Sequence, residues 1–382
     1  MAKYPPRLEM LDKLISSPSV SSTHSHIDSS NISVIHLLAE WLDACGFNIE
    51  IHSIDSQNNK ANLIAKLGDG DNGLVLSGHT DTVPCDEQLW SFDPFRFTAK
   101  DDRFYGLGSS DMKSFFALVI ESLSHINLNK LKKPLTILAT ADEESTMAGA
   151  KALLADRVKL GKYCVIGEPT NLRPVRQHKG IFMDSIHLTG RSGHSSDPSL
   201  GNNALEGMHE IIQAMLNYRD SLGTQFINNE FAVPTPTLNL GHIHGGDNPN
   251  RICGQCELHY DLRTLPDMNI DSVRKNLQDM IREISHKRNL QCEFSSLFDG
   301  TPALSTPANS DIVAITEELT GSSSQSVVFA TEGPYFSQMG METVVLGPGN
   351  IDVAHQPDEY IEADQLNQAV VLYKKIIEKI CL

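Results

Sequence analysis

The sequence predicts an α/β protein with two domains. Apolar segments alternate between helical and strand periodicity, this texture changes in the middle of the chain, and 382 residues are enough for two hydrophobic cores. Residues 1–180 and 292–382 are expected to form one split α/β domain. Residues 181–291 are expected to form an α+β insert with the element order β-α-β-β-α-β.

The first 180 residues alternate helices and strands, which indicates a mainly parallel sheet covered by helices. An early helix carries apolar residues from Ile35 to Leu42 on one face and ends at the glycine of Cys45-Gly46. Another helix is predicted near 114–127 from its apolar period. Strands are predicted at 48–53, 61–67, 74–78, 135–140 and 163–167.

The texture changes after Gly180, where the pattern is typical of an insert with an antiparallel sheet. Its predicted elements are strands near 182–188, 236–244 and 256–264 and helices near 203–221 and 271–288. The α/β pattern returns from about residue 292, and the split domain is completed by strands at 326–330 and 343–346 and a final helix near 363–380.

The charge balance is acidic, with 31 Lys and Arg residues against 48 Asp and Glu residues and a formal net charge of −17. We expect no nucleic-acid partner, because phosphates require a basic face. The balance modestly favours cationic or metal partners, although an acidic surface also simply keeps a protein in solution.

Several signals favour a cytoplasmic location. No run of 18 apolar residues occurs, so no membrane span is expected. The segment Met1–Pro6 has no apolar region, so we expect no secretory signal. Seven cysteines are scattered without a framework spacing, which suits free thiols. Cys253 and Cys256 could form a redox or zinc pair, but no second pair accompanies them, and two free thiols are preferred.

A short apolar run from Leu74 ends at Gly78 and is followed by His79, Thr80 and Asp81. The one-residue spacing places the histidine and the carboxylate on one side at a strand end, where ligands are commonly held. Imidazole is a common metal ligand, and a nearby carboxylate can orient it. A lone histidine of this kind is more often structural.

Further acidic and histidine side chains follow predicted strands or a glycine-rich turn. These candidate ligands are Asp111, Glu143, Glu144, Glu168 and His355. In open α/β sheets, ligands collect outside the carboxyl ends of strands. Taken singly, an Asp before a helix is usually an N-cap and a Glu-Glu pair is usually a solvated surface pair. Position alone therefore leaves the metal-site and structural interpretations both open.

Two histidines with three carboxylates would suit Zn²⁺, and five ligands exceed the three that one catalytic zinc needs. They fit two metal ions that share a bridging carboxylate. In the pair Glu143-Glu144, one carboxylate can bind metal while the other acts as a base toward the attacking water.

At these residues the chain resembles the M20 family of dinuclear zinc peptidases and deacylases. The matching segments, in the family's order, are Ser77–Pro84, Gly106–Lys113, Ala141–Glu144 and Gly167–Thr170. The resemblance implies a split metal-binding α/β domain with an inserted α+β lid domain that forms a homodimer. It also implies two Zn²⁺ ions per subunit, for which Co²⁺ can substitute.

The resemblance assigns a role to each candidate. His79, Asp111 and Glu168 would hold one zinc. Asp111, Glu144 and His355 would hold the other, with Asp111 bridging. Glu143 would be the general acid and base, and Asp81 would orient His79.

The lid segment Gly190–Ser196 is similar to the family's glycine-flanked histidine, so His194 would reach the partner subunit's active site and stabilise the oxyanion. The resemblance further implies substrate contacts in and beside the lid. Those positions are Lys179, Asn250, Arg263 and Thr331.

The C-terminal segments Thr331–Phe336, Leu346–Gly349 and His355–Tyr360 resemble the branch of the family that removes the acetyl group from the α-nitrogen of N-acetyl-L-ornithine, a step of arginine biosynthesis. The related succinyl-diaminopimelate desuccinylases usually have Thr-Ser-Asp where this chain has Thr331-Glu332-Gly333. A desuccinylase, a dipeptidase or another N-acyl-amino-acid deacylase remains the alternative, and a non-catalytic relative is disfavoured because the whole ligand set is present.

Overall fold

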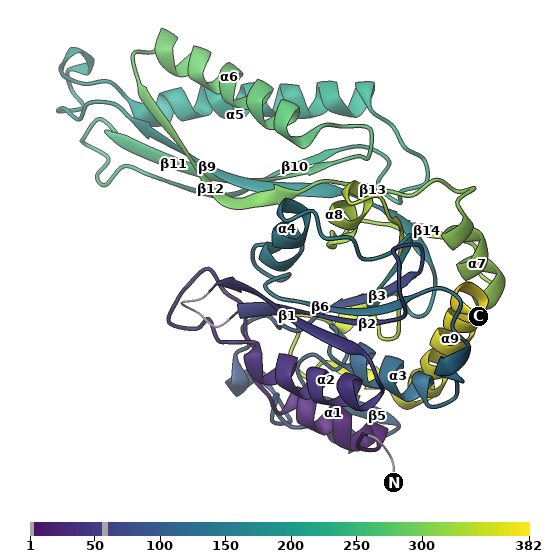
Figure 1. The fold of residues 1–382 in the computed structure, drawn as a ribbon. Coiled ribbons are helices and arrows are strands. Elements are labelled where there is room, and N and C mark those ends of the chain that lie inside the picture. The colour runs from purple at the N-terminus through teal and green to yellow at the C-terminus, as the bar shows by residue number, and fades with distance from the viewer. Residues whose placement is uncertain (1–3, 56–59) are drawn as a thin grey trace. The chain divides into compact units, whose positions relative to one another are not determined.

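The computed structural model describes residues 4–55 and 60–382, which form two compact units (Figure 1). The first unit comprises Met1–Gln177, Ser305–Gln325 and Thr331–Leu382, and the second comprises His178–Leu304 and Ser326–Ala330. The chain therefore leaves the first unit and returns to it, as expected for a split domain with an insert.

The first unit is built on a large sheet with the strand order β1-β2-β6-β3-β7-β15-β8-β13, in which β14 also pairs with β8. Its strands are β1 (Asn48–Asp55), β2 (Lys60–Leu67), β3 (Leu74–His79), β6 (Leu135–Thr140), β7 (Tyr163–Pro169), β8 (Val175–His178), β13 (Leu304–Ser305), β14 (Gln325–Val327) and β15 (Glu342–Gly347). Strands β3, β6 and β7 are buried along their whole length, which explains their continuous apolar runs.

This sheet is mixed, which corrects the prediction of a mainly parallel sheet. Four neighbouring strands of the sheet are parallel to one another, in the order β6-β3-β7-β15. Strand β2, however, pairs antiparallel with both β1 and β6. The α/β class itself is confirmed, and the parallel strands are the ones that end at the predicted ligands.

Helices cover both faces of the sheet (Figure 1). One face carries α1 (Arg7–Ile15), α2 (Ile32–Ala44), α3 (Ser114–Leu123) and α9 (Ala363–Cys381), while α4 (Ala148–Ala155) and α8 (Gly333–Gln338) lie on the other and α7 (Asp311–Thr320) packs against α9. Helix α3 is buried on nearly all sides, so it is the centre of this core. Four of these helices, α1, α4, α7 and α8, had no counterpart among the predicted elements.

Several short elements complete the first unit. A small sheet has the order β16-β5-β4, formed by β4 (Thr98–Lys100), β5 (Arg103–Tyr105) and β16 (Tyr360–Glu362). Short 3₁₀ helices occur at η1 (Glu87–Leu89), η2 (Leu128–Lys130) and η4 (Ile351–Val353).

The second unit is an antiparallel sheet with the order β10-β11-β9-β12, and both its helices lie on one face (Figure 1). In chain order its elements are β9 (Gly180–Thr189), η3 (Pro198–Leu200), α5 (Ala204–Gln225), β10 (Thr237–Gly245), β11 (Gln255–Thr264), α6 (Ile270–Lys287) and β12 (Gln291–Thr301). The unit extends beyond the predicted boundary at 292, because β12 pairs with β9 along most of its length.

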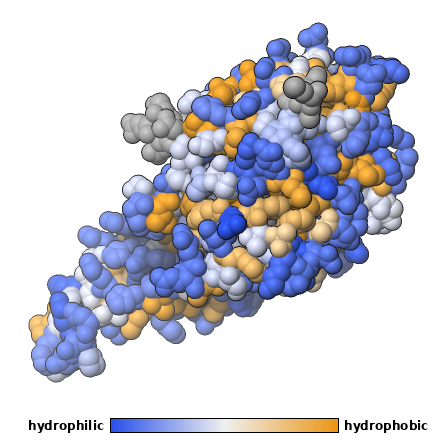
Figure 2. Space-filling view, turned by 90° about the horizontal axis from the view of Figure 1, so that it is seen from below, coloured by the Kyte–Doolittle hydropathy of each residue, from blue (hydrophilic) through white to orange (hydrophobic). Residues whose placement is uncertain are grey.

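The surface is largely hydrophilic in the view of Figure 2, with hydrophobic residues gathered in small groups between hydrophilic ones. Within the described residues, no helix has the length and apolar character needed to cross a bilayer. None of the seven cysteines, all of which lie in the described residues, forms a disulfide, and Cys253 and Cys256 are buried.

Candidate active site

The candidate site lies at the carboxyl ends of three adjacent strands of the first unit. His79 is the last residue of β3, Glu168 lies near the end of β7, and Glu143 and Glu144 follow β6. Strand β3 lies between the other two, and His79 pairs in register with Thr140, the last residue of β6. The parallel register therefore brings these side chains to one edge of the sheet.

Two loops bring the remaining candidates to the same edge. Asp111 precedes α3, and His355 follows β15 and the short helix η4. His355 has a left-handed backbone with φ of 60°, and Asp142 beside the glutamate pair has φ of 57°. Such conformations are uncommon in non-glycine residues and concentrate at functional sites.

Glycines directly before two ligands allow helix α3 to pack close to the strand ends. A Cβ on Gly78 would lie 2.9 Å from the Phe115 ring, and one on Gly167 would lie 2.0 Å from it. Phe115 is fully buried in the core of this unit. The pairs Gly78-His79 and Gly167-Glu168 thus set each ligand beside a close helix–strand contact.

Asp111 lies between the two histidines and offers one oxygen to each. Its Oδ1 is 3.0 Å from His79 Nε2, and its Oδ2 is 3.4 Å from His355 Nε2. Glu168 Oε1 lies 3.6 Å from His79 Nε2, and Glu144 lies 3.1 Å from His355 Nε2. The carboxylate of Asp111 is therefore placed as a shared ligand of two cations would be.

The donor atoms also group as metal ligands do. In one group the ligand atoms of His79, Asp111 and Glu144 lie within 4.8 Å of one another, and in another those of His79, Glu143 and Glu168 do. The carboxylate of Glu143 thus belongs to the same cluster as the candidate ligands. Distance alone does not separate a ligand from a base that acts on water beside the metals.

The electrostatics of the cluster favour a bound cation. Burial opposes a charge on His79, but the Glu168 and Asp111 carboxylates outweigh it and raise the pKa of His79 well above its ordinary value. Hydrogen bonds to Asp111 and Glu144 raise the pKa of His355 to about 11. Four carboxylates that converge with two imidazoles hold excess negative charge, which a divalent cation neutralises better than protons do.

Glu143 has the environment of a general acid and base. Its carboxylate is buried, and burial together with the negative charge of Glu168 raises the pKa of Glu143 well above its ordinary value. A carboxylate tuned upward in this way can accept and return a proton near neutral pH.

Asp81 contacts the candidate ligands on both sides of it in the site. The Nδ1 atom of His79 hydrogen bonds to the backbone carbonyl of Asp81 at 3.0 Å, whereas the nearer carboxylate oxygen lies 3.8 Å away. The other carboxylate oxygen accepts the backbone N–H of Glu144 at 3.0 Å. Asp81 therefore contacts two candidate ligands: the His79 ring through its backbone carbonyl and the backbone N–H of Glu144 through its carboxylate.

Two buried glutamates near the cluster were not assigned a role from the sequence. Glu359 accepts the backbone N–H groups of Ser110 and Asp111 at 2.7 and 3.0 Å, and burial and the nearby Asp111 charge raise its pKa to about 8. Glu332 accepts the Thr140 hydroxyl at 2.8 Å, and burial raises its pKa to about 8 as well. Glu359 lies in the C-terminal segment that carries His355, but only the fold shows that it holds the Asp111 loop.

The predicted residues of the second unit form two local groups. The backbone carbonyl of Asn250 accepts the N–H of Ser195 at 3.1 Å, which brings Asn250 beside the exposed His194. Lys179 is buried, donates from Nζ to the Thr235 carbonyl at 2.6 Å, and its pKa is lowered by burial and by nearby Arg263.

Thr331 belongs to the first unit and is fully buried. Its hydroxyl accepts the backbone N–H of Gly333 at 3.1 Å, at the start of α8. This contact gives Thr331 a local structural role in addition to the substrate contact that the sequence predicts.

A cluster of imidazoles and carboxylates at the carboxyl edge of an α/β sheet, buried here except for the exposed His355, is typical of metal-dependent hydrolases. The chain belongs to the peptidase family M20/M25/M40, whose family model matches residues 75–379. This range contains the whole cluster from His79 to His355, and the predicted resemblance is thereby confirmed.

Curated relatives match the chain over nearly its whole length. It is 46% identical to the acetylornithine deacetylase of Vibrio campbellii and 45% identical to that of Aliivibrio salmonicida. Each match covers 379 residues, which are 99% of this chain and 100% of the relative.

Solved structures share the fold at low identity. Aminopeptidase PepT from Bacillus cereus superposes with a TM-score of 0.76 at 16% identity and 99% coverage of both chains. A tripeptidase from Staphylococcus aureus gives a TM-score of 0.75 at 18% identity and 98% coverage of both chains. The YxeP protein of Bacillus subtilis, described as a dinuclear metal binding peptidase, gives 0.67 at 16% identity, with 97% and 96% coverage.

Proposed function

We propose that the protein is a dinuclear zinc amidohydrolase that removes the acetyl group from N(α)-acetyl-L-ornithine to give L-ornithine and acetate. The chemistry is supported above all by Asp111, which offers one oxygen to each of two histidines. The substrate is supported by identity of 45–46% to acetylornithine deacetylases over nearly the whole of both chains. The step belongs to arginine biosynthesis, and we propose a cytoplasmic location.

His79, Asp111 and Glu168 would hold one ion, and Asp111, Glu144 and His355 the other. When bound, the ions polarise the acyl carbonyl and lower the pKa of the attacking water to about 7. Glu143 would take the proton from the water as the water oxygen bonds to the acyl carbon, and would return it to the leaving amine as the acetyl C–N bond breaks, so that acetate and ornithine are released. The Asp81 and Glu359 contacts orient the ligands before the reaction.

The second unit would act as a lid and as the dimerisation domain of a homodimer. His194 of one subunit would donate to the developing oxyanion in the other, which fits its exposed position beside Asn250. Lys179, Asn250, Arg263 and Thr331 would contact the amino-acid part of the substrate.

The decisive experiment compares three substrates on the zinc- or cobalt-loaded protein. We expect kcat/KM to be highest for N-acetyl-L-ornithine and lower for succinyl-diaminopimelate and for a dipeptide, with ornithine and acetate released in equal amounts. All three reactions share the metal centre. The ratio of their kcat/KM values therefore reports only the pockets that hold the side chain and the acyl group. A higher kcat/KM on succinyl-diaminopimelate would replace the substrate and leave the chemistry in place.

A metal titration tests the chemistry independently of the substrate. The chelated protein should regain activity with two Zn²⁺ or Co²⁺ ions per chain, and the Asp111→Asn variant should fail to retain either ion tightly. Full activity in a protein that binds less than one ion per chain would contradict the dinuclear mechanism.

A further inference from the structure

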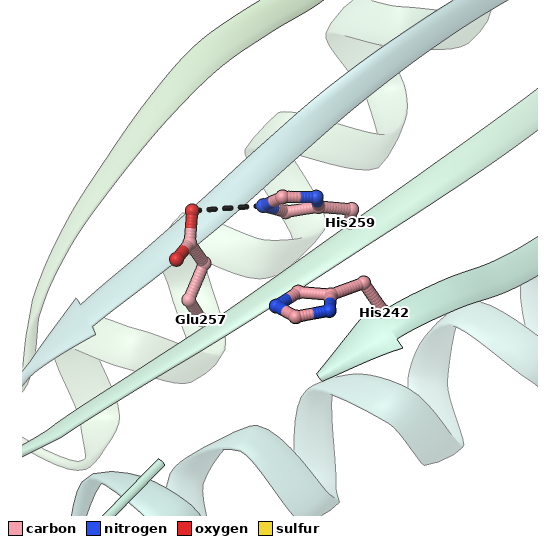
Figure 3. Close-up of side chains that lie close together, drawn as sticks. All are labelled: His242, Glu257 and His259. Atoms are coloured by element: carbon pink, nitrogen blue, oxygen red, sulfur yellow. Dashed lines mark hydrogen bonds and ion pairs between the residues drawn. The ribbon is translucent and has the colours of Figure 1, made fainter. Parts of the chain in front are cut away.

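The second unit carries another group of metal-ligating side chains, on the face of its sheet opposite the helices. His242 lies on β10, and Glu257 and His259 lie on β11 (Figure 3). Their ligand atoms lie within 4.8 Å of one another. All three are at least partly exposed, so a cation from solution can reach them.

A β-bulge places His242 on this face. Leu240 pairs with Tyr260, but His242 pairs with His259, so the register shifts by one residue at Gly241. Without the extra residue, His242 would point to the same face as Leu240, which packs against the core. The bulge turns the imidazole to the polar face and sets it directly opposite His259.

The three side chains converge on one space. The two imidazole rings lie side by side with centroids 4.6 Å apart, and each turns a nitrogen toward Glu257 (Figure 3). His259 Nε2 is 2.9 Å from Glu257 Oε1, and the Ser185 hydroxyl donates to the same oxygen at 2.9 Å. Glu257 Oε1 is therefore the carboxylate oxygen that faces the two rings (Figure 3).

A histidine–glutamate hydrogen bond would explain Glu257 and His259 but gives no reason for the placement of His242. Two imidazoles with one carboxylate match the ligands preferred by Zn²⁺, Cu²⁺ and Ni²⁺, whereas Mg²⁺ and Ca²⁺ prefer oxygen ligands. The hydrogen bonds from His259 and Ser185 lower the pKa of Glu257, so its carboxylate stays ionised. A cation that binds His259 Nε2 replaces the proton there, which moves to Nδ1 of the neutral ring.

A hollow of about 590 Å³ adjoins the group, and Glu257 lines it together with His187 and His244. Three protein ligands leave coordination positions open to water or to a small anion, and the hollow provides room for them.

We propose that His242, Glu257 and His259 form a surface site for one borderline divalent cation, in the second unit and additional to the buried cluster of the first. The site depends on the bulge at Gly241 and on the pairing of β10 with β11. It is independent of the proposed deacetylase activity.

Copper titration of the full-length protein tests this site. The tight sites are first filled with Zn²⁺ and loose metal is removed, and Cu²⁺ is then added while the electron paramagnetic resonance spectrum and the zinc content are recorded. We expect one Cu²⁺ per chain to bind without release of Zn²⁺, with nitrogen hyperfine splitting from two imidazoles. His242→Ala and His259→Gln should each abolish this signal, and Glu257→Gln should weaken binding while the nitrogen splitting remains.

The matched control is His209→Ala, an exposed histidine on α5 of the same unit. It should bind Cu²⁺ as the unchanged protein does, and circular dichroism should show that all variants are folded. An undiminished signal in His242→Ala and His259→Gln would overturn the proposal, as would an equal loss in His209→Ala. Copper uptake matched by zinc release would assign the signal to the buried cluster and also overturn it.

Discussion

The two units each bring histidines and carboxylates together, but they do so in different surroundings. In the first unit His79, Asp111 and Glu168 are buried, and their charges shift one another's pKa strongly. In the second unit His242 is exposed and Glu257 is only partly buried, so water screens the same kinds of groups. Similar residue types would thus give a tight charge-driven site in one place and a weaker surface site in the other.

Supporting contacts sharpen this difference. The buried cluster is held by Asp81 and Glu359, which bond to backbone groups beside the ligands. The surface group is held by the sheet register and by one serine hydroxyl. Because catalysis requires ligands fixed to a fraction of an ångström, the buried cluster is the one suited to perform a reaction.

The largest expected effect is on the buried base. Glu143→Gln removes the carboxylate that we propose moves the proton, so kcat should fall by about 10²–10⁴ while the metal content stays unchanged. Steady-state kinetics and metal analysis measure both quantities. The exposed Glu50→Ala on β1 is the control and should keep full activity. Normal turnover by Glu143→Gln would remove Glu143 from the mechanism.

The next effect concerns the support of Asp111. Glu359→Gln weakens the acceptor for the Ser110 and Asp111 N–H groups, and metal affinity should fall by about 10–100-fold. Excess Zn²⁺ should restore activity, which a general folding defect would not allow. Glu362→Gln, at the end of the adjoining strand β16 and paired with Arg103, should bind metal normally. Unaltered metal affinity in Glu359→Gln would show that the Asp111 loop keeps its conformation without the Glu359 carboxylate.

Metal removal should make the stability of the first unit depend on pH. His355 has its pKa raised from 6.5 to about 11, and Glu332 and Glu359 have theirs raised from 4.5 to about 8. Between pH 6.5 and 8 the folded state therefore holds more protons than the unfolded state, and the free energy of unfolding falls as pH rises.

Denaturation of the chelated and zinc-loaded protein across pH 6.5–8 measures this effect. The chelated protein should lose stability with rising pH, and the zinc-loaded protein should lose less, because the ions replace the protons. If the free energy of unfolding changes equally with pH in the two forms, the buried charges are balanced without metal.

The smallest expected effect is at the surface group. His242→Ala should leave kcat/KM unchanged and alter the free energy of unfolding by no more than about 0.5 kcal/mol, as is usual for surface positions. Kinetics and urea denaturation check both. A large loss of deacetylase activity in His242→Ala would contradict the difference drawn between the two units, because it would show that the surface group takes part in the reaction.

Much of the first unit could be predicted from the sequence. The runs that became β3, β6 and β7 are continuous and apolar because these strands are buried on both faces, and each ends at a candidate ligand. The antiparallel direction of β2 could not be predicted, since strand direction depends on the pairing partner. Helix α1 was missed, and the end of the insert was placed too early because β12 carries no buried residue before Thr301 and so gives little apolar signal.

The candidate ligands were all named from strand ends and motifs, but their supports were not. Glu359 is far from Asp111 in the chain, and only folding shows that it holds the Asp111 loop. The pairing of His242 with His259 likewise depends on a single extra residue at Gly241. No local pattern reveals such a bulge, because it is defined by the neighbouring strand.

The sequence by itself determined the α/β class, the insert, the family and the identity of the His and carboxylate residues, because periodicity and short motifs are local properties of the chain. The tertiary structure decided which oxygen of Asp111 faces which histidine, which carboxylates are buried, and which histidines meet on the second sheet. These features depend on distances between residues remote in sequence, and burial turns those distances into charge interactions strong enough to shift a pKa.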